Sequence, residues 1–214
     1  VLPPVVITAP TMQPPLVTQF HPRDPQQPLP ANDGASLLKT IPGMSVIRKG
    51  GTDGDPVFRG MAASRLNILI DGEQILGGCG MRMDPPTAYV FPDTFDKVSL
   101  IKGPQSVRHG PGGSAGTVLF ERKPTYFREP GAEFKAAVTG ASFNRYDTYV
   151  DAKAGTPLGY VQAQATEAAS GDYEDGDGTQ VNSAYRRRSL SAAVGWTPDE
   201  HTRLELSAIE SRAK

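Results

Sequence analysis

Hydrophobic and polar residues alternate with a period of two through the C-terminal part of the chain, residues 131–214. In "YDTYVDAKA" the two predicted faces are Asp147, Tyr149, Asp151 and Lys153 on one side and Tyr146, Thr148, Val150 and Ala152 on the other. "YVQAQAT", "RSLSAAVGW" and "RLELSA" repeat the alternation. Because successive side chains of a strand point to opposite faces, the pattern predicts strands of about ten residues with one apolar and one polar face.

Two architectures produce this alternation, an outer-membrane barrel and a soluble antiparallel sheet with one solvated face. Strand length favours the barrel, as does Trp196 near a strand end, where an aromatic girdle would lie. "GTPLG" and "WTPDEH" are short connections, whereas "SGDYEDGDGTQVNSAYR" is long and acidic. Short turns on one rim and long loops on the other are typical of such barrels, although the short connection through "SFNR" departs from the pattern.

Residues 33–130 read as a compact α+β domain. "DGASLLKT" predicts a short helix with Asn32 or Asp33 near its N-cap and an end before Pro42, since the residue before a proline is disfavoured in a helix. "RLNILIDGEQ" and "DKVSLIKG" predict strands. "RHGPGGSAGTVLFERK" predicts a glycine-rich turn that leads into a strand, and it lacks the GK[ST] ending of a phosphate loop.

Residues 1–32 hold nine of the twenty prolines, and their only charged side chains are Arg23 and Asp24. This composition predicts an extended, flexible arm. Within it lies "VVIT", formed by Val5, Val6, Ile7 and Thr8. Such a β-branched segment can add as a strand to the sheet edge of a partner, although composition alone favours a chance apolar patch in a flexible tail.

Composition excludes several classes of function. The formal net charge is −1, from 22 Lys and Arg against 23 Asp and Glu, which gives no reason to expect nucleic acid as a partner. No apolar run approaches the ~20 residues of a membrane-spanning helix. No set of nucleophile, base and acid points to catalysis, so the chain is not expected to be an enzyme.

Sulfur is concentrated in "GGCGMRMDPP", which contains Cys79, the single cysteine, and Met81 and Met83, two of five methionines. Thiolate and thioether are soft ligands that together select Cu(I). In a helical turn Cys79 and Met83 share a face while Met81 points away, whereas in an extended strand all three share a face. The alternative is that these residues pack as ordinary buried hydrophobes. Weaker metal candidates are His109, His201 and the acidic loop residues Asp172, Glu174, Asp175 and Asp177.

Three blocks, "IPGMSVIRKGG", "DPVFRGMAASRLNILIDGEQ" and "FDKVSLIKGPQSVRHGPGGSAGTVLFERK", resemble in order and spacing the plug domain of TonB-dependent outer-membrane receptors. The resemblance implies an α+β plug domain (33–130) inside a large antiparallel transmembrane β-barrel, of which residues 131–214 supply about five N-terminal strands. It also implies that residues 1–32 are a periplasmic arm whose Val5–Thr8 segment is the TonB box. "GTVLFERK" departs from the family's usual glycine pair and Asn- and Ile-rich strand.

Within this superfamily, "GGCGMRMDPPTAYVFP" resembles the TonB-dependent copper receptors, which carry a Cys-x-x-x-Met pair on an outward plug loop. The pair falls on Cys79 and Met83, with Met81 as a less secure third ligand. The resemblance implies a copper importer of the bacterial outer membrane, with copper, as Cu(I), as its transported ligand. The family adds a His and a Met from the barrel, and because no His-x-Met occurs in these 214 residues, those ligands are expected downstream.

Two other functions stay open: a receptor for a siderophore or another metal chelate, and a passive pore or structural barrel whose plug never moves. Plugged outer-membrane transporters have about 22 strands, and an open sheet edge is not stable in lipid. We therefore expect the remaining strands as a second polypeptide paired with this one or as residues that follow a loop after Lys214. The expected partners are TonB, outer-membrane lipid and the rest of the barrel.

Overall fold

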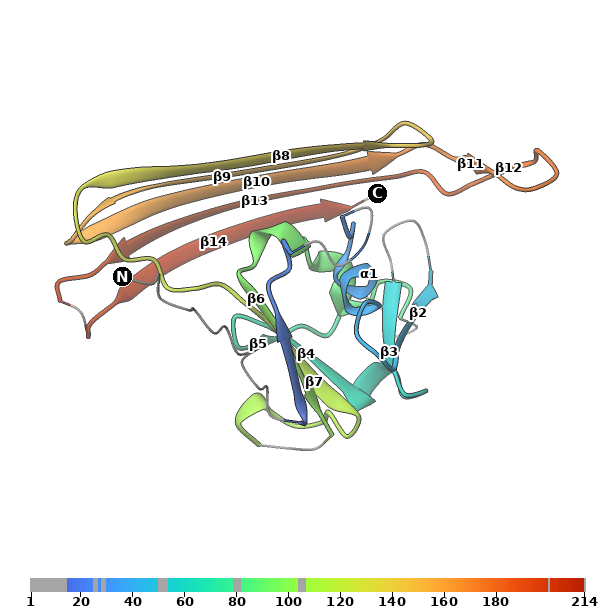
Figure 1. The fold of residues 1–214 in the computed structure, drawn as a ribbon, viewed down its shortest axis with the longest axis horizontal. Helices are drawn as coiled ribbons and strands as arrows, with labels where there is room; N and C mark the ends of the chain where they lie inside the picture. Colours follow the sequence, from blue (N-terminus) through green and yellow to red (C-terminus); the bar gives the residue numbers. More distant parts are fainter. Residues whose placement is uncertain are drawn as a thin grey trace, which may run out of the picture.

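The computed structural model describes residues 15–24, 27, 30–49, 54–78, 82–103, 107–199 and 201–213. These residues form an N-terminal domain, which ends near residue 123, and a C-terminal sheet, which begins at Gly131. Figure 1 shows the sheet as a long, gently curved layer on one side of the smaller domain. Among the described residues, no helix has the length and apolar character needed to cross a membrane.

The N-terminal domain is built on a five-stranded sheet in which β4 and β7 are parallel and the other neighbours are antiparallel. Its strands, in spatial order, are β1 (Val17–Phe20), β6 (Lys97–Lys102), β7 (Gly116–Glu121), β4 (Leu66–Ile70) and β5 (Glu73–Gln74). A hairpin of β2 (Met44–Arg48) and β3 (Gly54–Phe58), the helix α1 (Gly34–Leu38) and four short 3-10 helices complete the domain. The predicted strands over residues 65–74 and 96–103 are therefore confirmed.

The predicted helix begins at its predicted cap. The Asp33 side chain accepts a hydrogen bond from the Ser36 backbone N–H at 2.6 Å, and α1 ends at Leu38, before Pro42. Leu37 and Leu38 are buried in the domain core, which also contains Phe58, Ile68, Val90, Phe95, Val98, Leu100, Val118 and Phe120. The core thus joins α1, the hairpin and the main sheet into one packed unit.

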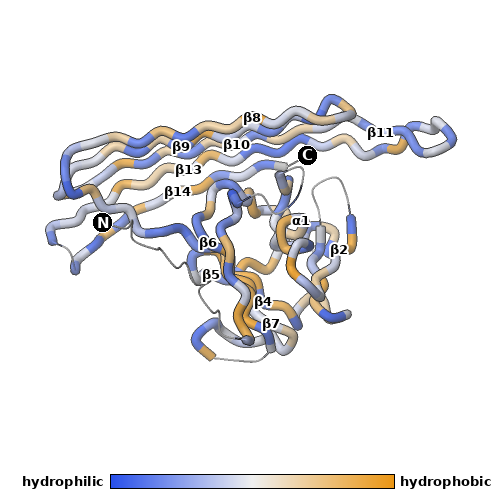
Figure 2. Tube along the Cα trace, in the orientation of Figure 1, coloured by the Kyte–Doolittle hydropathy of each residue, from blue (hydrophilic) through white to orange (hydrophobic). Residues whose placement is uncertain are grey.

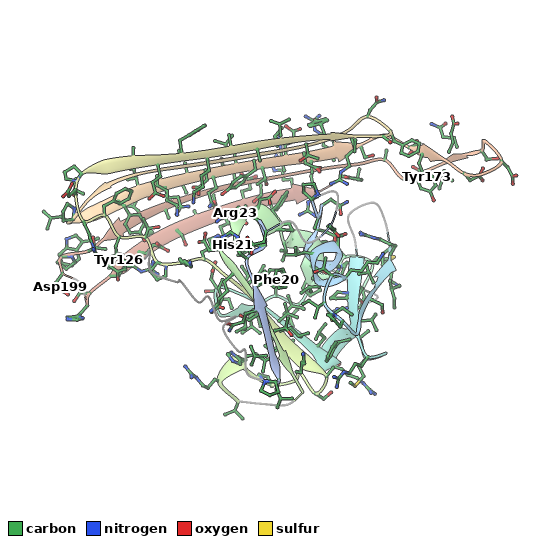
Figure 3. All side chains as sticks on the ribbon, in the orientation of Figure 1. Phe20, His21, Arg23, Tyr126, Tyr173 and Asp199 are labelled. Carbon is green, nitrogen blue, oxygen red and sulfur yellow. The ribbon has the colours of Figure 1, made fainter. Side chains whose placement is uncertain are left out.

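The arm predicted over residues 1–32 does not extend that far. β1 pairs with β6 along its whole length, from Val17 opposite Ile101 to Phe20 opposite Val98. Arg23 then donates to the backbone carbonyl of Asp93 at 2.9 Å and forms an ion pair with Asp96 at 2.5 Å. Figure 3 shows His21 and Arg23 just beyond the end of β1, where the domain faces the sheet. The predicted boundary at residue 32 is therefore too late, and Val5–Thr8 lie outside the described residues.

The C-terminal sheet confirms the predicted set of five long strands. In spatial order they are β14 (Leu204–Ala213), β13 (Tyr185–Trp196), β10 (Gly159–Ser170), β9 (Arg145–Thr156) and β8 (Gly131–Ala141), all antiparallel. The long connection between β10 and β13 carries a small hairpin of β11 (Tyr173–Glu174) and β12 (Gln180–Val181). Figure 1 shows this hairpin projecting beyond one end of the sheet.

The two faces of the C-terminal sheet differ as the alternation predicts, and Figure 2 shows hydrophilic and hydrophobic positions alternating along its strands. Tyr149 and Asp151 are buried on the polar face, whereas Val150 between them is exposed. Arg187 on the polar face donates to the backbone carbonyl of Val90 at 2.9 Å, so this face contacts the N-terminal domain. The other face exposes a broad apolar surface that includes Phe134, Val138, Val161, Leu190, Val194, Trp196 and Leu206.

Candidate metal centre

The candidate ligands occur in a loop whose two ends meet. Cys79, Gly80 and Met81 lie outside the described residues, but both flanks are described. The Gly78 N–H donates to the Asp84 carbonyl at 3.2 Å. A Cβ on Gly77 would lie 2.4 Å from that carbonyl oxygen, and one on Gly78 would lie 2.2 Å from the Asp84 carboxylate. Gly77, whose φ is +85° and whose close contact is with backbone, has to be glycine, and the glycine pair closes the base of the loop.

Arg82 holds the loop against the hairpin. Its Nη2 and Nε atoms lie 2.6 and 3.2 Å from the two carboxylate oxygens of Asp55, at the start of β3. The Asp55 side chain is 5% exposed and that of Arg82 22%, so the bidentate pair is largely shielded from water. Arg82 also adopts a positive φ of 59°. Its backbone conformation and its ion pair therefore fix the residue between Met81 and Met83.

Met83 is 60% exposed. Met83 therefore does not pack as a buried hydrophobe in this chain, whereas for Cys79 and Met81 that alternative stays open. Because Cys79 and Met81 are not described, the choice between a helical and an extended arrangement of the three sulfur residues stays a prediction.

The C-terminal flank of the loop is tied down by hydrogen bonds. The Tyr89 hydroxyl donates to the Asp84 carboxylate. Thr87, which is fully buried, donates through its hydroxyl to the Gly54 carbonyl at 2.6 Å. Tyr89 and Thr87 belong to a 3-10 helix, Pro86–Tyr89, that directly follows the loop. Both flanks of the loop are therefore held in place. Two of the contacts are made by hairpin residues, Asp55 with Arg82 and Gly54 with Thr87.

The part of the hairpin that contacts the loop is positioned by Asp33, the N-cap residue of α1. Asp33 is fully buried, and its Oδ2 accepts hydrogen bonds from Arg48 at 2.6 Å and from the Gly54 N–H at 3.3 Å. A Cβ on Gly54 would lie 2.8 Å from both Ala35 Cβ and Val46 Cγ1, so the backbone passes closely between helix and strand. Gly54 therefore links the start of α1 to Thr87, and its neighbour Asp55 links to Arg82.

A cavity of about 590 Å³ lies beside the base of the loop, between the N-terminal domain and the C-terminal sheet. The domain side includes Leu76, Gly77 and Tyr89, and the sheet side includes Gln164, Thr166 and Ser189. The sheet residues present amide and hydroxyl groups, which are hard donors and poor ligands for Cu(I). The described strands of the sheet therefore present polar groups beside the loop, and the described lining of this cavity includes no Cys, Met or His side chain.

The weaker metal candidates do not gather into a site. Within the described ranges, no group of three or more His, Cys, Asp or Glu side chains is placed to hold a metal ion. In the long acidic connection, Asp172 accepts from the backbone N–H groups of Ser183 and Ala184, both at 2.7 Å. Asp175 likewise accepts from Thr179 at 2.8 Å. These carboxylates cap turns of the loop.

Sequence reasoning missed Arg82 and Asp55. They are 27 positions apart, and neither residue type belongs to the soft-ligand pattern. The available signal was indirect: an arginine between two candidate ligands needs a carboxylate partner if it is to be shielded from water. Nothing in the sequence identifies which carboxylate that is.

Comparison with known proteins identifies the N-terminal domain. The family model described as "TonB-dependent Receptor Plug Domain" matches residues 12–117. A similar curated protein is the ferric enterobactin receptor PirA of Pseudomonas aeruginosa, which is 24% identical over 204 residues, or 80% of this chain and 27% of that protein.

Solved structures extend the similarity to the C-terminal sheet. The copper transporter OprC is 51% identical with a TM-score of 0.90, and the match covers 96% of this chain and 32% of that one. The ferric enterobactin receptor PfeA from Pseudomonas aeruginosa is 19% identical with a TM-score of 0.69, over 95% of this chain and 34% of that one. The FrpB iron transporter from Neisseria meningitidis is 20% identical with a TM-score of 0.72, over 93% and 32%.

PfeA and FrpB, at 19% and 20% identity, show the fold alone, whereas OprC shares about half of the aligned sequence as well. This chain spans about a third of the length of each of these structures. The match to the plug model, followed by five antiparallel strands that turn their polar face to that domain, agrees with the resemblance read from the sequence. The chain belongs to the TonB-dependent receptor family and carries its plug domain together with strands of its β-barrel.

Proposed function

We propose that this chain is the plug and first wall segment of an outer-membrane copper importer. Copper binds as Cu(I) to Cys79 and Met83 on the plug loop, with Met81 as an additional donor. Energy for uptake arrives through TonB, which pairs with Val5–Thr8 on the periplasmic side. The remaining wall strands supply the other ligands and close the barrel.

One observation carries this proposal: the similarity to the copper transporter OprC at 51% identity over 96% of the chain. The siderophore receptors with which the chain also aligns are 16–24% identical. Copper is therefore inferred as the substrate from OprC, which has a higher sequence identity to this chain than PfeA and PirA have.

The described contacts support a metal loop at this place. The loop is closed at its base, Arg82 is clamped to Asp55, and Met83 is exposed. A ligand set held before the metal arrives loses less conformational entropy on binding than a flexible one. Thiolate and thioether donors match Cu(I) and discriminate against hard cations.

The proposed orientation places the metal loop on the outer side. The cavity beside the loop is lined by Thr166, Ser189 and Ser211, which lie in the halves of their strands closer to the long β10–β13 connection. In outer-membrane barrels the long connections are extracellular and the short turns periplasmic. A metal ion arriving from outside would therefore meet the loop first.

The test is a Cu(I) titration of the purified full-length receptor against a colorimetric chelator under reducing conditions. Cys79→Ala is expected to weaken binding at least a hundredfold, because the thiolate is the anionic soft donor of the loop. Met83→Ala is expected to weaken it about tenfold. Met44→Ala, which removes a buried methionine of β2, is the matched control and should leave the affinity of the folded receptor unchanged.

Unchanged Cu(I) affinity in both Cys79→Ala and Met83→Ala would reject the copper site. A larger loss in Met81→Ala than in Met83→Ala would indicate an extended loop in place of a helical one. Uptake of a ferric siderophore by the same receptor, with no tight Cu(I) binding, would favour the chelate-receptor alternative that the similarity to PirA raises.

A further inference from the structure

Arg187 is a buried arginine of the C-terminal sheet that contacts the segment directly after the metal loop. It belongs to β13, is 2% exposed, and donates through Nη2 to the Val90 carbonyl at 2.9 Å. The central carbon of its guanidinium group lies 3.9 Å from the centroid of the Phe91 ring. A buried charge is costly to remove from water, and these two contacts, a charge-assisted hydrogen bond and a cation–π contact, compensate for part of that cost.

The segment that Arg187 contacts is tied to the base of the loop. Val90 is the C-cap of the 3-10 helix Pro86–Tyr89. Tyr89, the last residue of this helix, donates through its hydroxyl to the Asp84 carboxylate, and the Asp84 carbonyl accepts from the Gly78 N–H at 3.2 Å. A chain of contacts therefore leads from β13 through the short helix to both ends of the loop.

The contact lies next to the cavity beside the loop. Ser189 and Ser191, the next two residues on the same face of β13, line this cavity together with Gly77 and Tyr89 from the other side. Because β13 begins at the long connection, Arg187 lies one step closer to that connection than Ser189 does. The wall is thus joined to the plug at the end of the cavity nearer the long connection.

Other hydrogen bonds between the domain and the sheet attach to other segments. Arg145 of β9 donates to the Pro30 carbonyl at 3.2 Å, and Lys153 donates to the Thr125 hydroxyl at 3.4 Å. Pro30 precedes α1, and Thr125 belongs to the connection between β7 and β8. These contacts hold the plug in the sheet, whereas Arg187 holds the flank of the metal loop.

We propose that Arg187 is a positioning residue of the copper site, which fixes the metal loop at the distance from the wall at which loop and wall donors can bind one ion. The inference rests on the proposed function, in which Cys79 and Met83 share the ion with donors from the remaining wall strands. A ligand set in two parts binds tightly only while the parts keep a matching distance. Displacement of one part lowers the effective concentration of its donors at the ion.

The experiment compares Arg187→Met, Arg187→Lys and Arg145→Met in the full-length receptor. X-ray absorption of bound Cu(I) reports its sulfur and nitrogen donors, and a chelator titration reports its affinity. Arg187→Met is expected to lose the wall donors and to bind Cu(I) about tenfold more weakly. Arg187→Lys keeps a charged donor and should recover part of the loss. Arg145→Met removes another arginine that donates from the wall to a plug carbonyl, so it is the matched control and should keep the wild-type donors.

Hydrogen exchange of the copper-free receptor gives a readout that is independent of the metal. The amides of Ala88 and Val90, which are bonded within the short helix, should exchange several-fold faster in Arg187→Met and at the wild-type rate in Arg145→Met. Phe91→Leu removes the ring face and leaves Arg187 in place. It provides a second variant if Arg187→Met does not fold, and it should show a smaller change of the same kind.

Two outcomes would overturn the proposal: wild-type Cu(I) donors and affinity in folded Arg187→Met, or equal losses in Arg187→Met and Arg145→Met. In both, the wild-type receptor still binds Cu(I) tightly. They are therefore distinguishable from failure of the proposed function, in which the wild-type receptor does not bind it.

Discussion

Arg82 combines two features that depend on each other. Its φ of 59° is rare for a residue with a side chain and costs on the order of 1–3 kcal/mol. Such a conformation persists only where other contacts hold it, and the two hydrogen bonds to Asp55 are the described contacts that do so. The ion pair therefore positions the backbone that carries Met83.

We expect Asp55→Asn to loosen this position. Hydrogen bonds to charged groups contribute about 1.5–3 kcal/mol, so the unfolding free energy of the receptor should fall by about that amount. Cu(I) affinity should fall several-fold, because the loop then has to be ordered on binding. Chemical denaturation and the Cu(I) titration measure the two effects.

Asp71→Asn is the matched control for Asp55→Asn. It removes a carboxylate that pairs with Arg122 in the same domain, and asparagine tolerates the φ of 50° at that turn. It should lower stability slightly without changing Cu(I) affinity. If Asp55→Asn lowers stability and leaves the affinity intact, Asp55 only stabilises the fold and does not position the ligand loop.

At the scale of the element, β1 is followed by an ion pair between Arg23 and Asp96 that is sensitive to acid. Burial raises the pKa of the Asp96 carboxyl, but hydrogen bonds from the Lys123 N–H and from Arg23 outweigh burial, and the pKa lies below its ordinary value of 3.8. A lowered pKa in the folded state means that Asp96 stabilises the fold above its unfolded pKa. That contribution is lost as the pH falls through the lower, folded value.

We therefore expect amide hydrogens of Val17–Phe20 to exchange faster, after correction for intrinsic rates, once the pH falls below about 3.8. Hydrogen exchange of the full-length receptor across this range measures the step. Asp96→Asn should remove the step and give fast exchange throughout. Asp93→Asn should keep it, because Arg23 binds Asp93 through its backbone carbonyl. A step of unchanged size in Asp96→Asn would show that another group controls β1.

β1 is an element that could not be predicted from the sequence. "VTQF" is only four residues long and lies among prolines, so composition favoured an arm. Its pairing with β6 joins residues about 80 positions apart, and no local pattern reports that contact. The wall strands were predictable because each repeats a period of two over 10 to 12 residues. The α1 cap was predictable because Asp33 and its partner Ser36 are local.

The candidate site likewise combines local features, which the sequence shows, with contacts between distant segments, which it does not. The soft-ligand triplet and the glycine pair are local features, and the sequence identified the first of them directly. The contacts that position them, Asp55 with Arg82 and Gly54 with Thr87, join segments 27 and 33 positions apart. Their geometry follows only from the packing of the hairpin against α1.

At the scale of the whole molecule, the proposed TonB segment precedes an edge strand of the plug sheet. Val5–Thr8 come before β1, and β1 is held to β6 by four residue pairs and followed by Arg23. In the proposed mechanism, a pull on the arm acts first on β1, which can separate from β6 one pair at a time. The chain then leads to Asp33, whose carboxylate contacts Gly54 beside the anchor of the metal loop.

Val6→Pro tests whether the receptor depends on that pull. Proline lacks the backbone N–H that strand addition requires, so pairing with TonB should fail and copper uptake by cells should fall at least tenfold. Cu(I) binding to the purified receptor should be unchanged, since residues 5–8 contribute no ligand. Thr11→Pro, which also adds a proline to the arm but outside the segment, should leave uptake largely intact. Equal loss of binding and uptake in Val6→Pro would assign the arm a role in folding, and full uptake would instead favour a passive pore.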